Sequence, residues 1–210
     1  MRINLDGTIL TALTRIFDVI VATLLFLLCC LPVFTIGASL SAMYATMIAI
    51  AGDGCSGVTR YFIGKFKDNF KQATALWLPA ALLGLVVAGN IIACWGFEME
   101  ATMVLSVMRG LTIFCTALYT AMSIYIFAGI AVYRVTWKQA ISNALIFAMQ
   151  HLPGTLGLLL LSAVMVASVF VLWFFAFPVI VICLYQQGKL LRRIFGLVEP
   201  EEHHDEEIKY

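Results

Sequence analysis

The chain has 210 residues, of which 62% are hydrophobic and only 12% are charged, and its formal net charge is +1. A water-soluble domain carries about 25% charged residues, so this composition excludes a soluble globular protein and indicates an integral membrane protein. A charge balance this close to zero gives no support for nucleic acid as a partner.

Six apolar blocks follow one another along the chain, and each is a candidate membrane-spanning helix. A bilayer core about 30 Å thick requires about 20 apolar residues at a rise of 1.5 Å each. The run 19–51 is longer than the h-region of a removable signal peptide, about 7–15 residues, so we expect the N-terminal segment to be retained. The blocks are 17–31, 36–51, 73–95, 102–133, 153–174 and 178–187.

Pro32 predicts a turn inside the first long apolar stretch, 17–51. Proline lacks an N–H group and disfavours helical backbone in the residue before it, and the following Thr35 and Gly37 supply an N-cap and a flexible break. The segment FFAFP, which ends at Pro178, predicts a second turn of the same kind. Because both turns are apolar, we expect them at or just within the outer membrane interface, packed against protein.

The distribution of Lys and Arg predicts the topology. Of the 13 basic residues, 12 lie in the N-terminal arm, in 53–71, in 134–151 or in the tail after Gln187, and the exception is Arg109. Since short basic segments stay on the cytoplasmic side, an even number of crossings separates each pair of them. This predicts three hairpins, 17–51, 73–133 and 153–188, with both termini cytoplasmic.

The expected fold is therefore an all-α integral membrane helical bundle with six transmembrane helices in the cell membrane. Residues 1–198 form a single transmembrane domain, and the acidic tail 199–210 is disordered by composition. The blocks 36–51 and 178–187 are short for a 30 Å core, so five crossings remain an alternative.

Two basic segments predict amphipathic helices on the inner leaflet, each leading into a crossing. In the first, Tyr61, Phe62, Phe66 and Phe70 lie at helical spacing, away from the charged side chains. In the second, Trp137, Ile141, Leu145 and Ala148 share one side. Such helices lie in the membrane interface with their basic residues toward the cytoplasm. The basic residues of the expected interfacial or docking surface are Arg60, Lys65, Lys67, Lys71, Arg134 and Lys138.

Polar side chains inside apolar blocks are the candidates for a substrate or ion pathway, because a charge costs about 2.5–3.5 kcal/mol at a helix centre. These candidates are Asp18, Asn90 and Arg109. Each has a structural alternative: an i,i+3 ion pair of Asp18 with Arg15, a hydrogen bond of Asn90 to a neighbouring helix, and pairing of Arg109 with Glu98 or Glu100.

No motif in the sequence predicts an enzyme, a metal site or a cofactor. The six cysteines lack CxxC spacing, and two of the three histidines stand in the acidic tail. A Gly-rich phosphate loop, GxSxG and HExxH are all missing from the sequence. We therefore expect a non-enzymatic protein without catalytic, metal or cofactor sites.

The order of NLDG, TRIFDVIVATLLFLLCCLPVFTIGASLSAMYA and FKDNFKQATALWL resembles the YesL-like family of bacterial multi-pass membrane proteins. The resemblance runs from about Asn4 to Phe195 and is most specific in LCCLPVFTIGAS and FKDNFKQA. Where members of that family often carry Asn in the first crossing, this chain has Thr23.

That family is common in Gram-positive bacteria and has no established molecular function or site residues. Its members tend to be encoded beside sugar-uptake transporters, which implies an accessory part in carbohydrate import, with the permease or ATPase of a sugar ABC transporter as partner. A stand-alone transporter or channel with a pathway past Asp18 and Asn90 is one alternative. A structural or lipid-organising protein, with the bilayer as its only partner, is the other.

Overall fold

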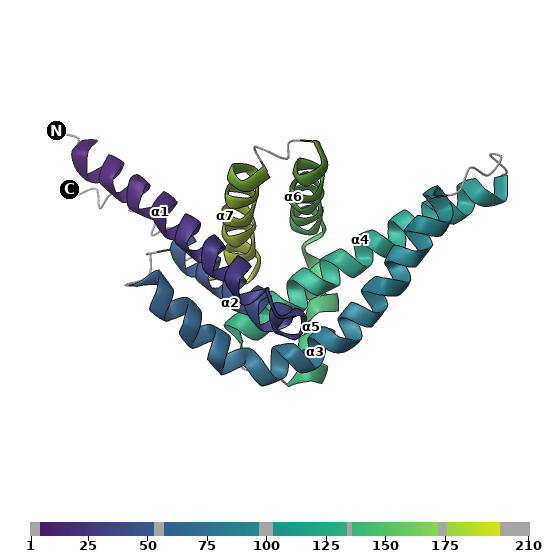
Figure 1. The fold of residues 1–210 in the computed structure, drawn as a ribbon, viewed down its shortest axis with the longest axis horizontal. Coiled ribbons are helices and arrows are strands. Elements are labelled where there is room, and N and C mark those ends of the chain that lie inside the picture. Colours follow the sequence, from purple (N-terminus) through teal and green to yellow (C-terminus); the bar gives the residue numbers. More distant parts are fainter. Residues whose placement is uncertain (1–4, 53–56, 97–102, 134–135, 172–175, 198–210) are drawn as a thin grey trace, which may run out of the picture.

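The computed structural model describes residues 5–52, 57–96, 103–133, 136–171 and 176–197, and the described elements are all helical, as predicted. Figure 1 shows their arrangement. Arg134, Glu98, Glu100 and the tail 199–210 lie outside the described residues. The elements are α1 (Leu5–Cys29), the short 3-10 helix η1 (Val33–Thr35), α2 (Ile36–Ala51), α3 (Val58–Trp95), α4 (Met103–Val132), α5 (Trp137–Gln150), α6 (Leu152–Val171) and α7 (Ala176–Ile194).

The predicted hairpins are present as packed helix pairs: α1 with α2, α3 with α4, and α6 with α7. The first pair turns at Pro32, whose backbone is extended (φ −78°, ψ 122°). The Thr35 hydroxyl lies 2.6 Å from the carbonyl oxygens of both Cys29 and Pro32 and shares its proton between them. Thr35 therefore satisfies carbonyls at the end of α1 and does not act as the expected side-chain N-cap of α2.

The number of membrane crossings is not confirmed at six. Among the described residues, four segments are long and apolar enough to cross a membrane: Val33–Ala51, Val58–Trp95, Met103–Val132 and Leu152–Phe170. The predicted crossings in α1 and α7 are not among these four. In α7, Lys189, Arg192 and Arg193 occupy the last two turns. Six crossings, and the alternative of five, remain predictions.

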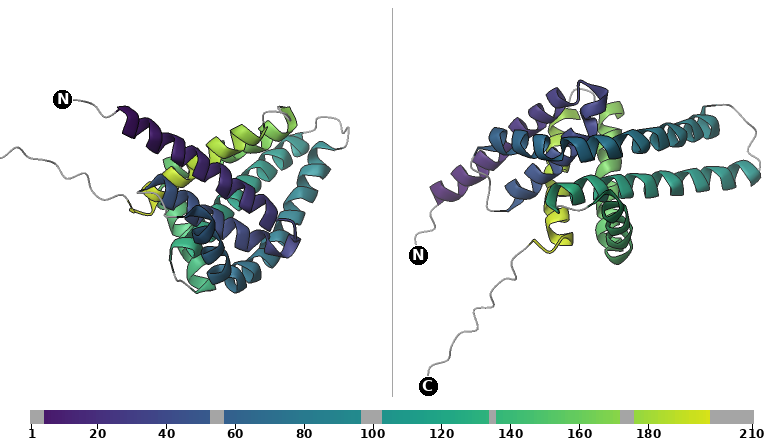
Figure 2. Two further views of the ribbon diagram at one scale, coloured as in Figure 1. Left: turned by 60° about the vertical axis from the view of Figure 1, so that its left-hand side comes forward. Right: turned by 90° about the horizontal axis from the view of Figure 1, so that it is seen from below.

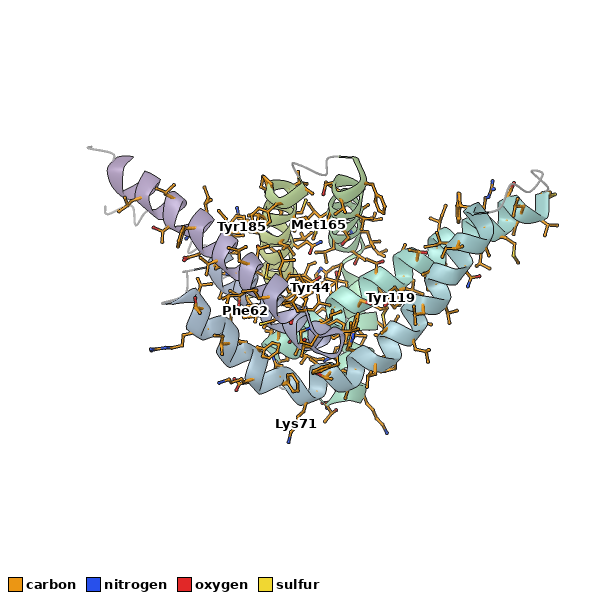
Figure 3. The ribbon with its side chains drawn as sticks, in the orientation of Figure 1. Tyr44, Phe62, Lys71, Tyr119, Met165 and Tyr185 are labelled. Atoms are coloured by element: carbon orange, nitrogen blue, oxygen red, sulfur yellow. The ribbon has the colours of Figure 1, made fainter. Side chains whose placement is uncertain are left out.

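Helix α3 differs from the prediction of a separate interfacial helix followed by a crossing. It is one continuous helix of 38 residues, about 57 Å long, which is nearly twice the thickness of a bilayer core. The helix bends, and Lys71 lies at the lowest point of the bend in Figure 3. Pro79 lies inside α3 just beyond this point. A proline removes the hydrogen bond to the carbonyl four residues earlier and clashes with that carbonyl. The helix therefore kinks in the turn that precedes the proline.

Helix α2 is the centre of the core and packs against α1, α3, α4 and α7. Small residues allow this close packing, and Ala38, Ala42 and Ala45 are buried. A Cβ atom on Gly37 would lie 2.5 Å from Trp77 Cβ, and one on Gly188 would lie 2.7 Å from Met47 Cβ. Gly37 is therefore a contact point between α2 and α3 within a regular helix, and the expected flexible break is wrong.

The first hairpin does not turn at the level at which the second one turns. The Trp77 indole Nε1 donates to the Val33 carbonyl at 2.9 Å, which places the Pro32 turn beside Trp77. The second hairpin turns after Trp95, 18 residues or about 27 Å further along α3. The Pro32 turn thus lies near the beginning of the predicted crossing 73–95, and not at its outer end as expected, because α1 and α2 pack along the N-terminal half of α3.

The described helices form an open V. Figure 1 shows α1, α2 and the first half of α3 in one arm, the second half of α3 with the first half of α4 in the other, and α6 and α7 between them. The view from below in Figure 2 shows the α3–α4 arm projecting from the body. This arm exposes apolar side chains on several sides, including Leu82, Leu85, Val86, Ile92, Met103, Val107, Leu111 and Phe114.

Candidate functional site

A pocket of about 1230 Å³ lies between α3, α4 and α5, and we call it the α3 pocket. One wall is a single face of α3. The other wall is the end of α4 and the beginning of α5. The α3 wall consists of Lys65, Asp68, Asn69, Gln72, Ala75, Leu76 and Pro79, and the opposite wall consists of Ile130, Ala131, Val132, Tyr133, Thr136 and Ile141.

The α3 wall changes from polar to apolar along the helix. Its residues recur at intervals of three and four, the spacing that aligns side chains on one helix face. The first four members, from Lys65 to Gln72, carry an ammonium, a carboxylate and two amides, whereas the last three, from Ala75 to Pro79, carry no polar side-chain group. The pocket therefore has a polar end and an apolar end.

Lys65 closes the polar end against the end of α4. Its Nζ donates to the Ala131 carbonyl at 3.4 Å and lies 5.8 Å from the centre of the Tyr61 ring. Carbonyl oxygens in the last turn of a helix carry partial negative charge, which favours an ammonium group there. Lys65 is half-buried as a result, whereas its neighbour Lys67 is exposed.

A second polar residue of this wall, Asn69, ties α3 to the core. Its Nδ2 donates to the Ser41 hydroxyl on α2 at 3.1 Å. This hydrogen bond to α2 fixes the orientation of the Asn69 amide. Asp68 lies at the exposed edge of the pocket, one helical turn after Lys65. A carboxylate and an ammonium thus line the polar end together.

The opposite wall is held by hydrogen bonds of its own. The Tyr133 hydroxyl donates to the Phe195 carbonyl at 3.2 Å, and the two rings meet edge to face with centroids 5.6 Å apart. Thr136 caps α5 through a capping box with Gln139, whose Oε1 accepts from the Thr136 backbone N–H at 3.0 Å. The pocket therefore lies between two anchored walls.

Helix α5 packs against the body through small residues, of which only Ala148 belongs to the apolar side predicted from the sequence. Ala140, Ala144 and Ala148 are buried in the described structure, whereas Ile141 and Leu145 are exposed. The small alanines permit close packing of α5 against the body, whereas Ile141 and Leu145 lie outside this contact, with Ile141 at the wall of the α3 pocket. An exposed apolar face beside Lys138 is what an interfacial helix requires, so this arrangement is compatible with the predicted membrane contact.

The described residues of the expected docking surface lie on the two elements that border the α3 pocket. Lys65 lines the pocket, and Arg60, Lys67 and Lys71 are exposed on the same half of α3. Lys138 is exposed in the first turn of α5. Figure 3 shows Lys71 pointing away from the body of the molecule.

The three residues predicted to mark a pathway are not brought together. Asp18 is half-buried on α1, whereas Asn90 lies near the end of α3 and Arg109 near the beginning of α4. Figure 1 shows α1 in one arm of the V and these ends of α3 and α4 in the other. The exposed Asn90 donates to the Val86 carbonyl of its own helix at 3.0 Å. Arg109 Nε donates to the Cys94 carbonyl at 3.0 Å, and its guanidinium lies 5.8 Å from the Trp95 ring. Arg109 therefore binds the end of α3, and its expected acidic partners lie outside the described residues.

The expected ion pair between Arg15 and Asp18 is not formed among the described residues. Arg15 Nη2 instead donates to the Gly52 carbonyl at the end of α2, at a distance of 3.1 Å. This contact joins α1 to the C-terminal end of α2, where a cation is favoured by the helix dipole. Arg15 thus has a packing role that sequence spacing did not indicate.

Hydroxyl groups within the apolar helices are used mainly inside their own helix. Thr23, Thr46, Thr116 and Ser123, for example, each donate to the carbonyl four residues earlier, at 2.7–2.8 Å. Other hydroxyl contacts join helices, among them Tyr125 with the Thr155 hydroxyl at 3.0 Å, and Gln187 Nε2 with the Ser162 hydroxyl at 3.1 Å. Gln187 is only 2% exposed, so this contact joins α6 and α7 inside the structure.

Metal-binding residues do not gather in the described part of the chain: no group of three or more His, Cys, Asp or Glu side chains could hold an ion there. The described cysteines are unpaired, and Cys94 and Cys183 are buried. Sequence reasoning singled out Lys65 but missed Asp68, Asn69 and Gln72. The signal that could have found them is their spacing from Lys65, which places all four on one face.

Residues 19–91 match a family described only as a protein of unknown function, DUF624. The matched segment contains the whole α3 wall of the pocket, whereas α4 and α5 lie outside it. The resemblance to the YesL-like family is consistent with this match. No curated protein and no solved structure matches the chain.

Proposed function

We propose that this chain is an accessory or regulatory membrane protein that works beside a carbohydrate importer. The observation that carries the proposal is the α3–α4 arm, which projects from the body with apolar side chains exposed on several sides. Leu85 is 70% exposed and Met103 is 84% exposed. An apolar two-helix arm is a surface for lipid or for the transmembrane helices of another protein.

The polar groups of the membrane helices favour an accessory part over independent transport. A carrier normally gathers polar side chains from several helices at one site near the middle of the bilayer. Here Asn90 and several hydroxyls donate to carbonyls of their own helices. Asp18 is on α1, which belongs to the other arm of the V (Figure 1). The carbohydrate importer as partner follows from the family resemblance alone.

In the proposed complex, the two ends of α3 have different tasks. The apolar half, with α4, packs against the permease helices within the bilayer. The basic half, with Arg60, Lys67 and Lys71 exposed, faces the cytoplasm, where the ATPase of such an importer lies. Basic residues at this surface contribute to partner choice and association rate more than to affinity.

A site-specific photo-cross-linking experiment tests the arm as the docking surface. A photoreactive phenylalanine replaces Leu85 in the arm, and in a matched control it replaces Leu156 of α6, which is similarly exposed at 61%. Both variants are co-expressed with the permease and ATPase of an oligosaccharide importer from the same organism. We expect a cross-link to the permease from position 85 only. Equal cross-linking from both positions, or from neither, would contradict docking through the arm.

A stand-alone transporter is the second candidate, and the α3 pocket is the observation that favours it. At about 1230 Å³ the pocket exceeds the roughly 300–1,000 Å³ of common small-molecule sites. Purified chain reconstituted alone in liposomes, with labelled oligosaccharide outside, separates the two candidates. The accessory proposal predicts no uptake by this chain alone and altered uptake when the importer is present; uptake without the importer would end it.

A further inference from the structure

We infer that the α3 pocket binds one membrane phospholipid with a phosphoethanolamine head, with the head at Lys65 and Asp68 and an acyl chain along Leu76 and Pro79. This inference goes beyond the proposed function and does not depend on it, because it requires no partner protein. It follows from the length of the pocket, from the order of its polar and apolar residues, and from the charges at its polar end.

The pocket has the length of one bilayer leaflet. Lys65 and Pro79 mark its two ends on α3, 14 residues or about 21 Å apart along the helix. Half of a bilayer that is about 40–45 Å thick with its headgroups is roughly 20–22 Å. A single lipid molecule extended along α3 therefore reaches from one end of the pocket to the other.

The order of residues matches the order of groups in a phospholipid. The polar members come first, on the basic half of α3, which the positive-inside rule places at the cytoplasmic headgroup region. The apolar members Ala75, Leu76 and Pro79 come last, where α3 carries no further charge before its end at Trp95. A soluble ligand such as a free sugar phosphate would fill only the polar end and leave the apolar end unoccupied.

The charges at the polar end select among headgroups. Lys65 supplies a half-buried ammonium for a lipid phosphate, the group that lysine binds as a point charge. Asp68 supplies a carboxylate one turn away, which attracts an ammonium group and repels an anionic head. Phosphoethanolamine carries both a phosphate and an ammonium. Phosphoglycerol carries the phosphate alone, and Asp68 has no cation to pair with in that head.

Lipid titration of the purified, delipidated chain tests this inference, with binding followed by native mass spectrometry. The probes are dioleoyl phosphatidylethanolamine and dioleoyl phosphatidylglycerol at equal concentrations. We expect the wild-type chain to prefer the ethanolamine lipid. Lys65→Gln should weaken both lipids by about fivefold or more, because both lose the phosphate contact. Lys71→Gln is the matched control, since this exposed lysine on the same helix does not line the pocket.

Asp68→Asn gives the decisive result, because the two lipids should respond in opposite directions. The ethanolamine lipid loses the partner of its ammonium group and binds more weakly, whereas the glycerol lipid is relieved of a repulsion and binds more tightly. We expect the preference to change by about tenfold in favour of the glycerol lipid. An unchanged preference would overturn the inference.

Filling the apolar end tests the acyl-chain part separately. Ala75→Trp places an indole in the pocket and should abolish binding of both lipids, whereas Leu78→Trp, at a 61% exposed position outside the pocket, should leave binding unchanged. Glycerophosphoethanolamine, the head without chains, should not displace the lipid at equal concentration. Displacement by this soluble head, or a protein co-purifying in place of lipid and lost with Ala75→Trp, would contradict a lipid occupant.

Discussion

At the scale of single residues, glycine and alanine determine how closely the helices around α2 approach one another. Helix α2 is buried on nearly all sides, and its neighbours approach it through glycine and alanine. Membrane helices gain little from the hydrophobic effect when they associate within lipid, so close van der Waals packing has to hold them together. Positions where a Cβ atom would collide with the next helix therefore have a large effect on stability.

Gly37 provides the test of this point. Gly37→Ala would place a Cβ atom 2.5 Å from Trp77 Cβ and 2.6 Å from the Ala73 carbonyl oxygen, so α2 and α3 must separate. We expect a loss of about 1–3 kcal/mol in the free energy of unfolding, measured by circular dichroism in mild detergent. Gly64→Ala is the matched control in a helix with open space around the glycine, and it should be neutral or slightly stabilising. Equal effects of the two changes would show that the α2–α3 contact is not tight.

At the scale of the elements, the bend of α3 decides what the helix can do. Its basic half packs with α1 and α2, and its apolar half pairs with α4 in the arm. The Tyr119 hydroxyl donates to the Ala80 carbonyl at 3.0 Å, one residue beyond Pro79, and so links α4 to the kinked turn. Along α3 the charged residues all precede Gln72, so the helix has a basic half and a half without charged side chains.

Pro79→Ala restores an N–H group that can donate to the Ala75 carbonyl and should straighten α3. Spin labels at Ile63 and Ile92, which are exposed on the two sides of the bend, would be about 44 Å apart along a straight helix of 29 residues. We expect the measured distance to increase toward this value in the variant. The control pair, Val104 and Leu118 on α4, should stay near 21 Å. An unchanged distance between the α3 labels would show that packing, and not the proline, holds the bend.

Sequence reasoning located elements better than it located their joins. The apolar block 36–51 is α2, and the block 73–95 ends with α3 at Trp95, because loss of apolar periodicity is a local signal. The fusion of the predicted interfacial helix in 53–71 with the block 73–95 had a local signal, since only Gln72 separates them and no Pro or Gly stands at the join. The change from polar to apolar residues suggested a boundary that the backbone does not have. The pocket depends on α4 and α5 covering one face of α3, which is a tertiary contact that the sequence does not show. Lys65 stood out in the sequence as one of the basic residues, and its charge alone gave no reason to group Asp68 with it.

At the scale of the whole molecule, the open V separates the basic half of α3 from the tip of the α3–α4 arm (Figure 1). In place of the expected helical bundle, the described helices form two arms, with α6 and α7 between them (Figure 1). The arm formed by α3 and α4 offers an apolar surface, and the basic half of α3 carries the pocket and the exposed lysines. The docking proposal and the lipid proposal both require the basic half of α3 to face the cytoplasm and the tip of the arm to reach the other side.

Labelling of single cysteines tests this requirement most directly. In a chain whose six native cysteines are replaced by alanine, Gly64→Cys marks the basic half of α3 without removing a lysine, and Met103→Cys marks the tip of the arm. A membrane-impermeant maleimide is added to intact cells and to inverted membrane vesicles. We expect position 64 to be labelled only in inverted vesicles and position 103 only in intact cells; labelling of both positions from the same side would contradict the account.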